Sequence, residues 1–260
     1  MYAFDFQRPA TLAEALDALR DDGAQALAGG QTLIPALKQR LAMPDRIVSL
    51  SGIDALKGMS VSAGVLTVGA AMTHAAVAKQ TDYPALAALA AGIGDPHVRN
   101  LGTIGGSLAN NDPSACYPAA ALASGATIVT NAREIAAADY FTGFFETALE
   151  EGEVVTAVRF PIPDRAAYVK FEQPASRFAL VGVFVADVAG DLRVAVTGAS
   201  EDGVLRWAAA EAALSSGISP SALGGLSMPP DDLIGDVHAS PEYRAHLVAV
   251  VARRAVEALA

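Results

Sequence analysis

The stretch Gln25-Ala-Leu-Ala-Gly-Gly-Gln-Thr32 decides the fold of the N-terminal part of the chain. Its first four residues form a short run that is mostly apolar, which predicts a short buried strand. Gly29 and Gly30 follow directly and predict a tight turn, because glycine adopts backbone angles that other residues avoid. Thr32 is a residue type that caps helices, so we expect a helix to start after it.

The helix expected after Thr32 is amphipathic and would connect two strands. Its apolar face would consist of Leu33, Leu37 and Leu41. Arg46–Leu50 is rich in β-branched and apolar residues and predicts the next strand. Residues 25–50 therefore have the strand, turn, helix, strand order of a βαβ unit.

The remaining chain alternates between helical and strand patterns. Thr11 to Glu14 predicts a capping box at the start of the first helix. Residues 92–118 show little periodicity, and a long irregular segment in a compact domain is usually functional. Hydrophobic spacing predicts strands at residues 65–70, 126–129, 153–160, 178–188 and 192–197, and helices at 83–91, 119–124, 205–214 and 241–259.

Composition excludes several classes of protein. The 260 residues include 52% hydrophobic and 18% charged side chains, with a net charge of −10 and one cysteine. The negative charge disfavours nucleic acid as a partner. One cysteine forms neither an internal disulfide nor an iron–sulfur site, so metal redox chemistry is expected on another chain. We find no membrane span and no signal peptide, and expect a cytoplasmic location.

Two glycine pairs are the candidate ligand-binding features. Ala28-Gly-Gly-Gln-Thr32 and Thr103-Ile-Gly-Gly-Ser107 each place paired glycines beside hydroxyl side chains. Such turns expose backbone N–H groups to an anion, and the first pair precedes a helix N-terminus. Together they would hold a diphosphate from two sides. Glycine pairs also occur in ordinary turns, and the residues alone leave that alternative open.

The usual nucleotide and hydrolase motifs are missing. Gly92-Ile-Gly94 begins like a Rossmann fingerprint, but His97 stands where the last glycine belongs. The sequence contains no P-loop, no nucleophile elbow and no H-E-x-x-H motif. A Rossmann NAD site, nucleotide hydrolysis and hydrolase chemistry are therefore disfavoured.

The two glycine pairs lie within longer stretches that resemble a known family. Ala28-Gly-Gly-Gln-Thr-Leu-Ile-Pro35 and the run from Asp95 to Pro113 are similar to the flavin-binding segments of carbon monoxide dehydrogenase medium subunits and other molybdenum hydroxylases. The FAD domain of xanthine dehydrogenase is the corresponding part of that enzyme. The resemblance covers essentially the full chain, and the order and spacing of both motifs make it specific.

The resemblance implies an α+β fold with three parts. Residues 1–54 and 55–168 would form the two subdomains of an FAD-binding domain of the vanillyl-alcohol-oxidase (PCMH) type. Residues 169–260 would form a small α/β C-terminal domain. The break after Phe160, at Pro161-Ile-Pro163, is the best boundary that the residues themselves offer.

The resemblance also implies a set of FAD-binding residues. One side of the diphosphate and ribityl chain would be wrapped by Ala26, Leu27, Ala28, Gly29, Gly30, Gln31, Thr32 and Leu33. The other side would be wrapped by Gly102, Thr103, Ile104, Gly105, Gly106 and Ser107. Ile93 and Val155 would give apolar contacts to the flavin or adenine. Lys170 would lie near the ring system, where a cation stabilises the charge of reduced flavin.

Two positions depart from the family pattern. Cys116 stands where many relatives carry an aspartate that binds the ribityl hydroxyls, so that hydrogen bond is expected to be lost or moved to Asp112 or Ser114. Phe178 stands where relatives carry a tyrosine, which keeps stacking but removes a hydroxyl. We expect these changes to affect the affinity for FAD and the choice of oxidant, but not the class of cofactor that is bound.

The implied function is electron transfer inside a larger oxidoreductase. Electrons from a molybdenum-cofactor large subunit would pass through a [2Fe-2S] small subunit to FAD on this chain, and then to NAD, a quinone or oxygen, within a dimer of heterotrimers. No catalytic residue and no metal ligand is expected here. A free-standing FAD-dependent oxidoreductase and a scaffold subunit without flavin are the alternatives.

Other conspicuous residues are expected to be structural. His97 is interpreted as a loop histidine and Cys116 as a buried small hydrophobe. His74, His238 and His246 share no metal-ligand spacing. Trp207 and the aromatic cluster Phe141–Phe145 are predicted to lie in the core.

Overall fold

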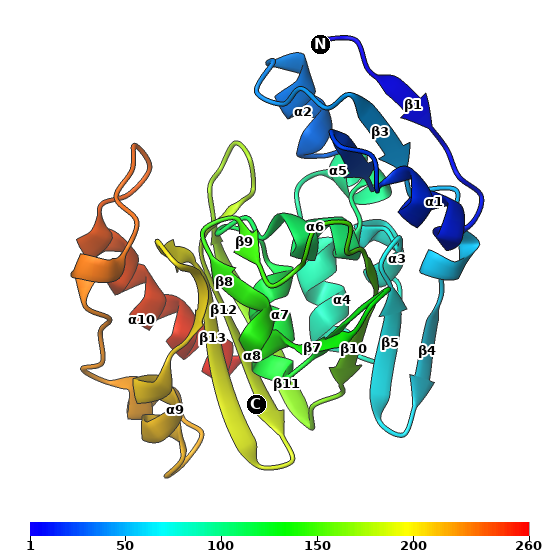
Figure 1. Cartoon of the computed structure of the whole chain (residues 1–260). Helices are drawn as coiled ribbons and strands as arrows, with labels where there is room; N and C mark the ends of the chain where they lie inside the picture. Colours follow the sequence, from blue (N-terminus) through cyan, green and yellow to red (C-terminus); the bar gives the residue numbers. More distant parts are fainter. Residues whose placement is uncertain (260) are drawn as a thin grey trace.

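A small parallel sheet forms the N-terminal part. The computed structural model describes residues 1–259. Its first sheet has the order β1-β3-β2 with both pairings parallel (Figure 1). The elements are β1 (Asp5–Gln7), α1 (Leu12–Ala18), β2 (Ala24–Leu27), α2 (Leu33–Lys38) and β3 (Arg46–Ser49). The βαβ connectivity predicted for residues 25–50 is confirmed.

The two helices of this part differ in how well their ends were predicted. The capping box of α1 is present, with Thr11 and Glu14 each bonding the other's backbone. For α2 the predicted start is confirmed, because the helix begins at Leu33 directly after Thr32, whereas the predicted capping bond and C-terminal end are wrong. Thr32 makes no capping bond, and the helix ends at Lys38 in a Schellman motif with Arg40 at φ +61°. Leu41 therefore lies beyond the helix and is 77% exposed.

The second sheet is antiparallel and carries the helices of the central part on one face. Its strand order is β4-β5-β10-β6-β7. The strands are β4 (Met59–Ser62), β5 (Val65–Gly69), β6 (Thr127–Thr130), β7 (Glu134–Ala136) and β10 (Val155–Pro161), and the helices are α3 (His74–Val77), α4 (Pro84–Ala91), α7 (Tyr117–Ser124) and α8 (Ala137–Tyr140). The alanines of α4 and α7 allow both helices to pack closely.

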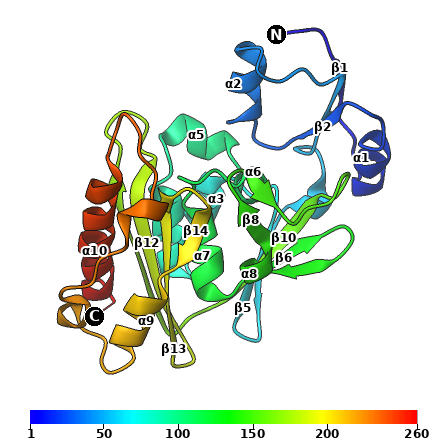
Figure 2. The same cartoon turned by 60° about the vertical axis from the view of Figure 1, so that its left-hand side comes forward.

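The third sheet lies between two layers of helices. Its strands β11 (Arg165–Glu172), β12 (Ala179–Val188), β13 (Asp191–Ser200) and β14 (Gly203–Arg206) pair antiparallel in sequence order. One face packs on α7, and the other is covered by α9 (Ala208–Leu214) and α10 (Pro241–Glu257) (Figure 2). Short 3-10 turns lie at Asp54–Leu56, Pro220–Leu223 and Pro230–Asp232.

Two details of this third part differ from expectation. Hairpin connections make the sheet wholly antiparallel, so this part is α+β in the strict sense, where the resemblance implied α/β. Residues 205 and 206 belong to β14 rather than to a helix. The N–H of Trp207 still bonds Val194 on β13, so helix α9 starts only at Ala208.

The central strand β12 joins two hydrophobic cores. Val183 and Val185 point into the core shared with α10, whereas Phe184 and Ala186 point into the core shared with α4 and α7. This alternation follows from the pleat of a strand that is buried on both faces. A third, smaller core lies under α1 and β3. The first sheet thus has the thinnest apolar support.

The segment 92–118 is more regular than predicted. It contains α5 (Pro96–Leu101) and α6 (Ile104–Asn110). Asp95 caps α5 through the N–H of Val98, and Thr103 caps α6 through the N–H of Gly106. The prediction of irregular structure is wrong because helices of one or two turns are too short to show an apolar repeat. No helix within residues 1–259 is long and apolar enough to cross a membrane.

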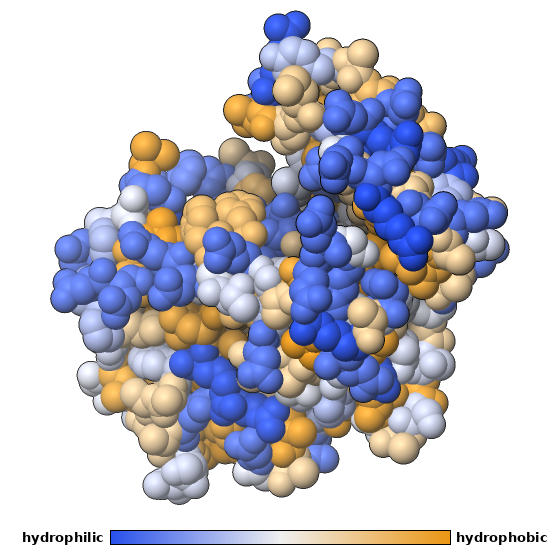
Figure 3. Space-filling view, in the orientation of Figure 1, coloured by the Kyte–Doolittle hydropathy of each residue, from blue (hydrophilic) through white to orange (hydrophobic). Residues whose placement is uncertain are grey.

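The aromatic cluster is only partly in the core. The hairpin of β8 (Phe141–Gly143) and β9 (Glu146–Thr147) exposes Phe144 and Phe145, by 56% and 46%. An apolar area lies over this hairpin on the molecular surface (Figure 3). The core prediction is wrong for these two residues, since the hairpin tip turns them outward, and it is confirmed for Trp207, which is buried.

A buried arginine fastens α10 to the third sheet. The Arg244 guanidinium donates to the carbonyl oxygens of Leu180 and Gly198, each at 2.6 Å, and to Asp236 at 2.7 Å. The side chain of Arg244 is only 3% exposed. Removing it would leave buried acceptors without partners.

We expect Arg244→Met to lower the free energy of unfolding by about 3 kcal/mol, because breaking a buried charge pair leaves its partners unsatisfied. Urea unfolding followed by circular dichroism measures the loss. Arg254→Met, which removes an exposed guanidinium from the same helix, is the matched control and should change little. Equal stability of the two variants would contradict the role given to Arg244.

Candidate cofactor site

The first glycine segment, residues 26–33, presents a run of free backbone donors. It leads from the end of β2 into the first turn of α2, with Gly30 at φ +71°. The N–H groups of residues 29–33 donate to no acceptor within the described residues 1–259. Consecutive free N–H groups at the start of a helix form an anion-binding concavity. The hydroxyl of Thr32 is also free, because it makes no capping bond.

The second glycine segment, residues 102–107, lies directly against the first. A Cβ placed on Gly29 would overlap the carbonyl oxygen of Leu101 and lie 2.6 Å from the Cα of Gly102. A Cβ on Gly106 would lie 3.2 Å from the Cβ of Ala28. The structure therefore brings the two predicted segments together, and glycine at position 29 is what permits the contact.

The glycines of the second segment have a different role from the one predicted. Gly105 and Gly106 lie inside α6, where the N–H of Gly105 bonds Ala70 at 2.9 Å and that of Gly106 bonds Thr103 at 3.1 Å. The prediction of a turn with exposed N–H groups is wrong for this pair. A Cβ on Gly105 would lie 2.5 Å from the Cβ of Ala70, so this glycine serves the packing of α6 on β5.

Four further residues that were predicted to contact the flavin differ in exposure. Phe178 is 56% exposed directly before β12, and Ile93 is half-buried. Val155 is 4% exposed and belongs to the core, which leaves it little surface for a ligand. The Lys170 ammonium donates to the carbonyl oxygens of Gly92 and Arg177.

Asp112 and Cys116 lie in the loop between α6 and α7, which is hydrogen-bonded to β13 of the third sheet. The N–H of Gly198 donates to the carbonyl oxygen of Pro113 at 2.8 Å, and the Thr197 hydroxyl lies 2.8 Å from the same oxygen. Asp112 accepts from the N–H of Ser114 at 2.8 Å, yet burial raises the pKa of its carboxyl group. Burial also raises the pKa of the Cys116 thiol, which keeps it protonated and unreactive.

A histidine that the sequence left aside supports the second segment. The N–H of His74 donates to Gly102 at 2.9 Å, and its Nδ1 lies 3.2 Å from the hydroxyl of Tyr117. A Cβ on Gly102 would lie 2.6 Å from His74 Nε2. Burial, together with the positive charge of Arg99, lowers the pKa of His74 to about 4. The sequence offered no signal for this contact, since residues 74 and 102 are far apart in the chain.

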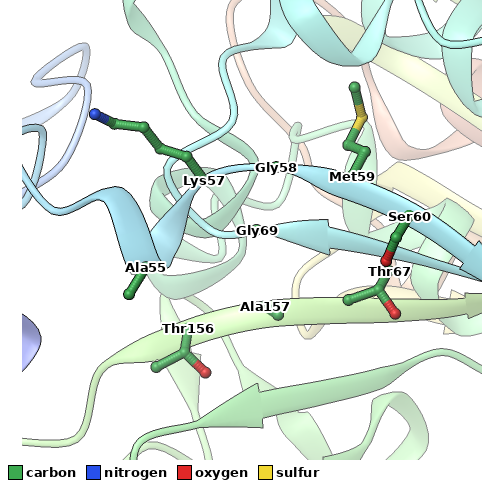
Figure 4. A pocket seen from close by; sticks show the side chains of 9 residues that line it. All are labelled: Ala55, Lys57, Gly58, Met59, Ser60, Thr67, Gly69, Thr156 and Ala157. Atoms are coloured by element: carbon green, nitrogen blue, oxygen red, sulfur yellow. The ribbon is translucent and has the colours of Figure 1, made fainter.

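A hollow on the surface lies apart from the two glycine segments. A depression of about 260 Å³ lies where β4, β5 and β10 meet, next to Lys57 and Thr156 (Figure 4). Its lining includes none of the predicted ligand-binding residues. The ammonium of Lys57 is bound to Asp54 at 2.8 Å. The candidate site therefore rests on the two glycine segments.

Comparison with known proteins identifies the family. Residues 2–163 match the family model described as "FAD binding domain in molybdopterin dehydrogenase". This chain belongs to that family. It is 37% identical to the carbon monoxide dehydrogenase medium chain of Afipia carboxidovorans over 70% of this chain and 68% of the relative. It is 34% identical to the nicotine 6-hydroxylase medium subunit of Paenarthrobacter nicotinovorans over 98% and 96%.

A solved structure extends the likeness to the whole fold. Quinoline 2-oxidoreductase from Pseudomonas putida 86 superposes with a TM-score of 0.86 at 30% identity, covering 99% of this chain and 97% of that one. The α+β class is confirmed. FAD is the cofactor of this family, and the chain is part of an oxidoreductase.

The residues present fit FAD. A diphosphate is an anion rich in hydrogen-bond acceptors, and the N–H groups of residues 29–33 are donors without protein partners. A side chain at Gly29 would push the two segments apart. An extended diphosphate held between two segments requires a run of N–H donors and a close approach of the two backbones, and both are present.

The low pKa of His74 makes stability depend on pH. Between pH 6.5 and pH 4 the unfolded chain protonates this histidine and the folded chain does not, so stability falls as the pH falls. The loss from this residue is about 3 kcal/mol across that window. Above pH 6.5 both states are neutral and the effect vanishes.

Urea unfolding of the wild type and of His74→Gln at pH 7, 6, 5 and 4 tests this. We expect the stability of the wild type to fall more steeply than that of the variant. His238→Gln changes an exposed histidine and should behave as the wild type. Parallel curves for the wild type and His74→Gln would show that His74 titrates normally in the folded chain.

Proposed function

We propose that the two glycine segments hold FAD so that this chain relays electrons between a partner's iron–sulfur clusters and a terminal acceptor. Bound FAD supplies the redox chemistry, and the protein supplies binding and orientation. The observation that supports this site is the run of free N–H groups at residues 29–33, placed against Gly102 of the second segment.

Each segment contributes in its own way. The N–H groups of residues 29–33 and the hydroxyl of Thr32 donate to the diphosphate. The second segment forms the opposite wall with Ser107, and Ala70 and His74 bond its backbone. The hydroxyl of Thr103 in this segment is buried and accepts from the N–H of Gly106. We propose that the remaining predicted residues, including Asp112, Cys116 and Phe178, also contact the bound FAD.

The chain works as the medium subunit of a heteromeric molybdenum hydroxylase. Relatives are named medium chain or medium subunit, and one of them is a subunit of a dehydrogenase complex. We infer a large molybdenum-cofactor subunit and a small [2Fe-2S] subunit as partners, in a dimer of heterotrimers. The acceptor would be NAD, a quinone or oxygen.

We propose FAD-binding subdomains at residues 1–54 and 55–168, of the vanillyl-alcohol-oxidase type, and a C-terminal domain at 169–260. Each part carries one of the three main sheets, although β11 starts at Arg165 and crosses the second boundary. The single, buried thiol of Cys116 suits the reducing cytoplasm.

Cofactor analysis tests the proposal directly. The chain is produced alone and together with its large and small partner subunits, and the cofactor is released with acid and identified. We expect one FAD for each copy of this chain in the complex, and no substrate turnover by the chain alone. A complex without FAD would overturn the proposal. Full substrate turnover by the isolated chain would show that substrate oxidation does not require the partner subunits.

A substitution at Thr32 tests the first segment without disturbing the fold. Because its hydroxyl caps nothing, Thr32→Ala should leave Tm unchanged. It should raise the Kd for FAD about fivefold, the cost of about 1 kcal/mol for one hydrogen bond. Titration of the flavin-free chain with FAD, followed by flavin fluorescence, measures Kd. Thr81→Ala, at an exposed site, is the control, and an equal Kd for both variants would remove Thr32 from the site.

A further inference from the structure

Three consecutive carbonyl oxygens between α4 and α5 are each bound by a cationic side chain. Lys170 Nζ donates to Gly92 at 2.7 Å. The Arg99 guanidinium donates to Ile93 at 3.0 Å and to Gly94 at 2.7 Å. We call residues 92–95, which lead into α5, the carbonyl loop. Its backbone is thus held by two side chains from different elements.

Lys170 ties this loop to a second one. The same ammonium donates to the carbonyl oxygen of Arg177 at 2.8 Å and lies 3.6 Å from Glu172. The side chain of Lys170 is only 5% exposed. The N–H donors of Lys170 are therefore directed at protein oxygens. Phe178 directly follows Arg177, whose carbonyl oxygen Lys170 binds.

The cations fix the direction of the peptide groups in the carbonyl loop. The C=O and N–H of one trans peptide point in opposite directions. Because Arg99 binds the carbonyls of Ile93 and Gly94, the N–H groups of Gly94 and Asp95 point away from Arg99. Neither N–H donates to an acceptor within residues 1–259. The loop therefore offers two adjacent free donors.

The free donors of the carbonyl loop belong to the same structural unit as the cofactor segments. The loop continues through α5 into Leu101 and Gly102, whose backbone contacts Gly29. Gly94 has φ +51°, and a Cβ there would lie 2.9 Å from the side chain of Val98. The loop conformation is thus dictated by close packing and by the two cations together.

We propose that Arg99 and Lys170 are positioning residues that orient the carbonyl loop so that its free N–H groups donate to the bound flavin nucleotide. The inference rests on the proposed function, since FAD is the ligand. It changes the role expected for Lys170 from a cation beside the ring to a clamp on protein carbonyls. Arg99 gains a role that the sequence did not suggest.

FAD titration of full-length variants tests the clamp. Arg99→Met and Lys170→Met should each raise the Kd for FAD at least tenfold and change the visible circular dichroism of the bound flavin, because the loop donors lose their direction. Lys170→Arg should restore both, since a guanidinium can bind two carbonyls. Arg254→Met and Lys79→Met remove exposed cations elsewhere and should leave both unchanged.

The outcomes separate the clamp from the cofactor site itself. Wild-type protein that binds no FAD would overturn the proposed function and the clamp with it. Wild-type binding with unchanged Kd and spectrum in the two methionine variants would overturn the clamp alone. If Arg99→Met does not fold, Arg99→Gln replaces it. Its uncharged amide is shorter than the guanidinium and cannot hold both carbonyl oxygens, so a raised Kd supports the clamp and a wild-type Kd overturns it.

Discussion

The contact between the backbone of Gly29 and that of Leu101–Gly102 is the constraint on which the site depends. It joins the small first sheet, which has the thinnest apolar support, to the helices of the central part. No side chain other than hydrogen fits at position 29 without moving the Leu101 carbonyl. The first segment thus packs its backbone against the second while its own N–H groups stay free.

Several independent contacts hold that second segment. The N–H of Gly105 bonds Ala70 at the end of β5, the N–H of His74 bonds Gly102, and Arg99 binds two carbonyls before α5. Helix α6 is thus held from several sides, and in the proposed site the donors to the ligand come from the first segment and the carbonyl loop.

The sequence predicted the structure of the two glycine segments well where local rules decide and poorly where packing decides. Gly29, Gly30 and the strands around them follow from residue type and spacing, so the backbone of the first segment was predictable. Gly105 and Gly106 look like a turn in the sequence, and only packing explains why two glycines stand in a helix, Gly105 against Ala70 and Gly106 against Ala28. The roles of His74 and Arg99 depend on residues distant in the chain or on carbonyl groups, which leave no trace in a single sequence.

The character of the site also fits the charge of the chain. The protein has a net charge of −10, and neither glycine segment contains a lysine or an arginine. An anionic diphosphate would therefore meet backbone dipoles rather than side-chain cations. Such donors do not titrate and need little reorganisation when the ligand binds. The cations Arg99 and Lys170 are bound to carbonyl oxygens, so in the proposed site they would shape the backbone that binds instead of neutralising the ligand.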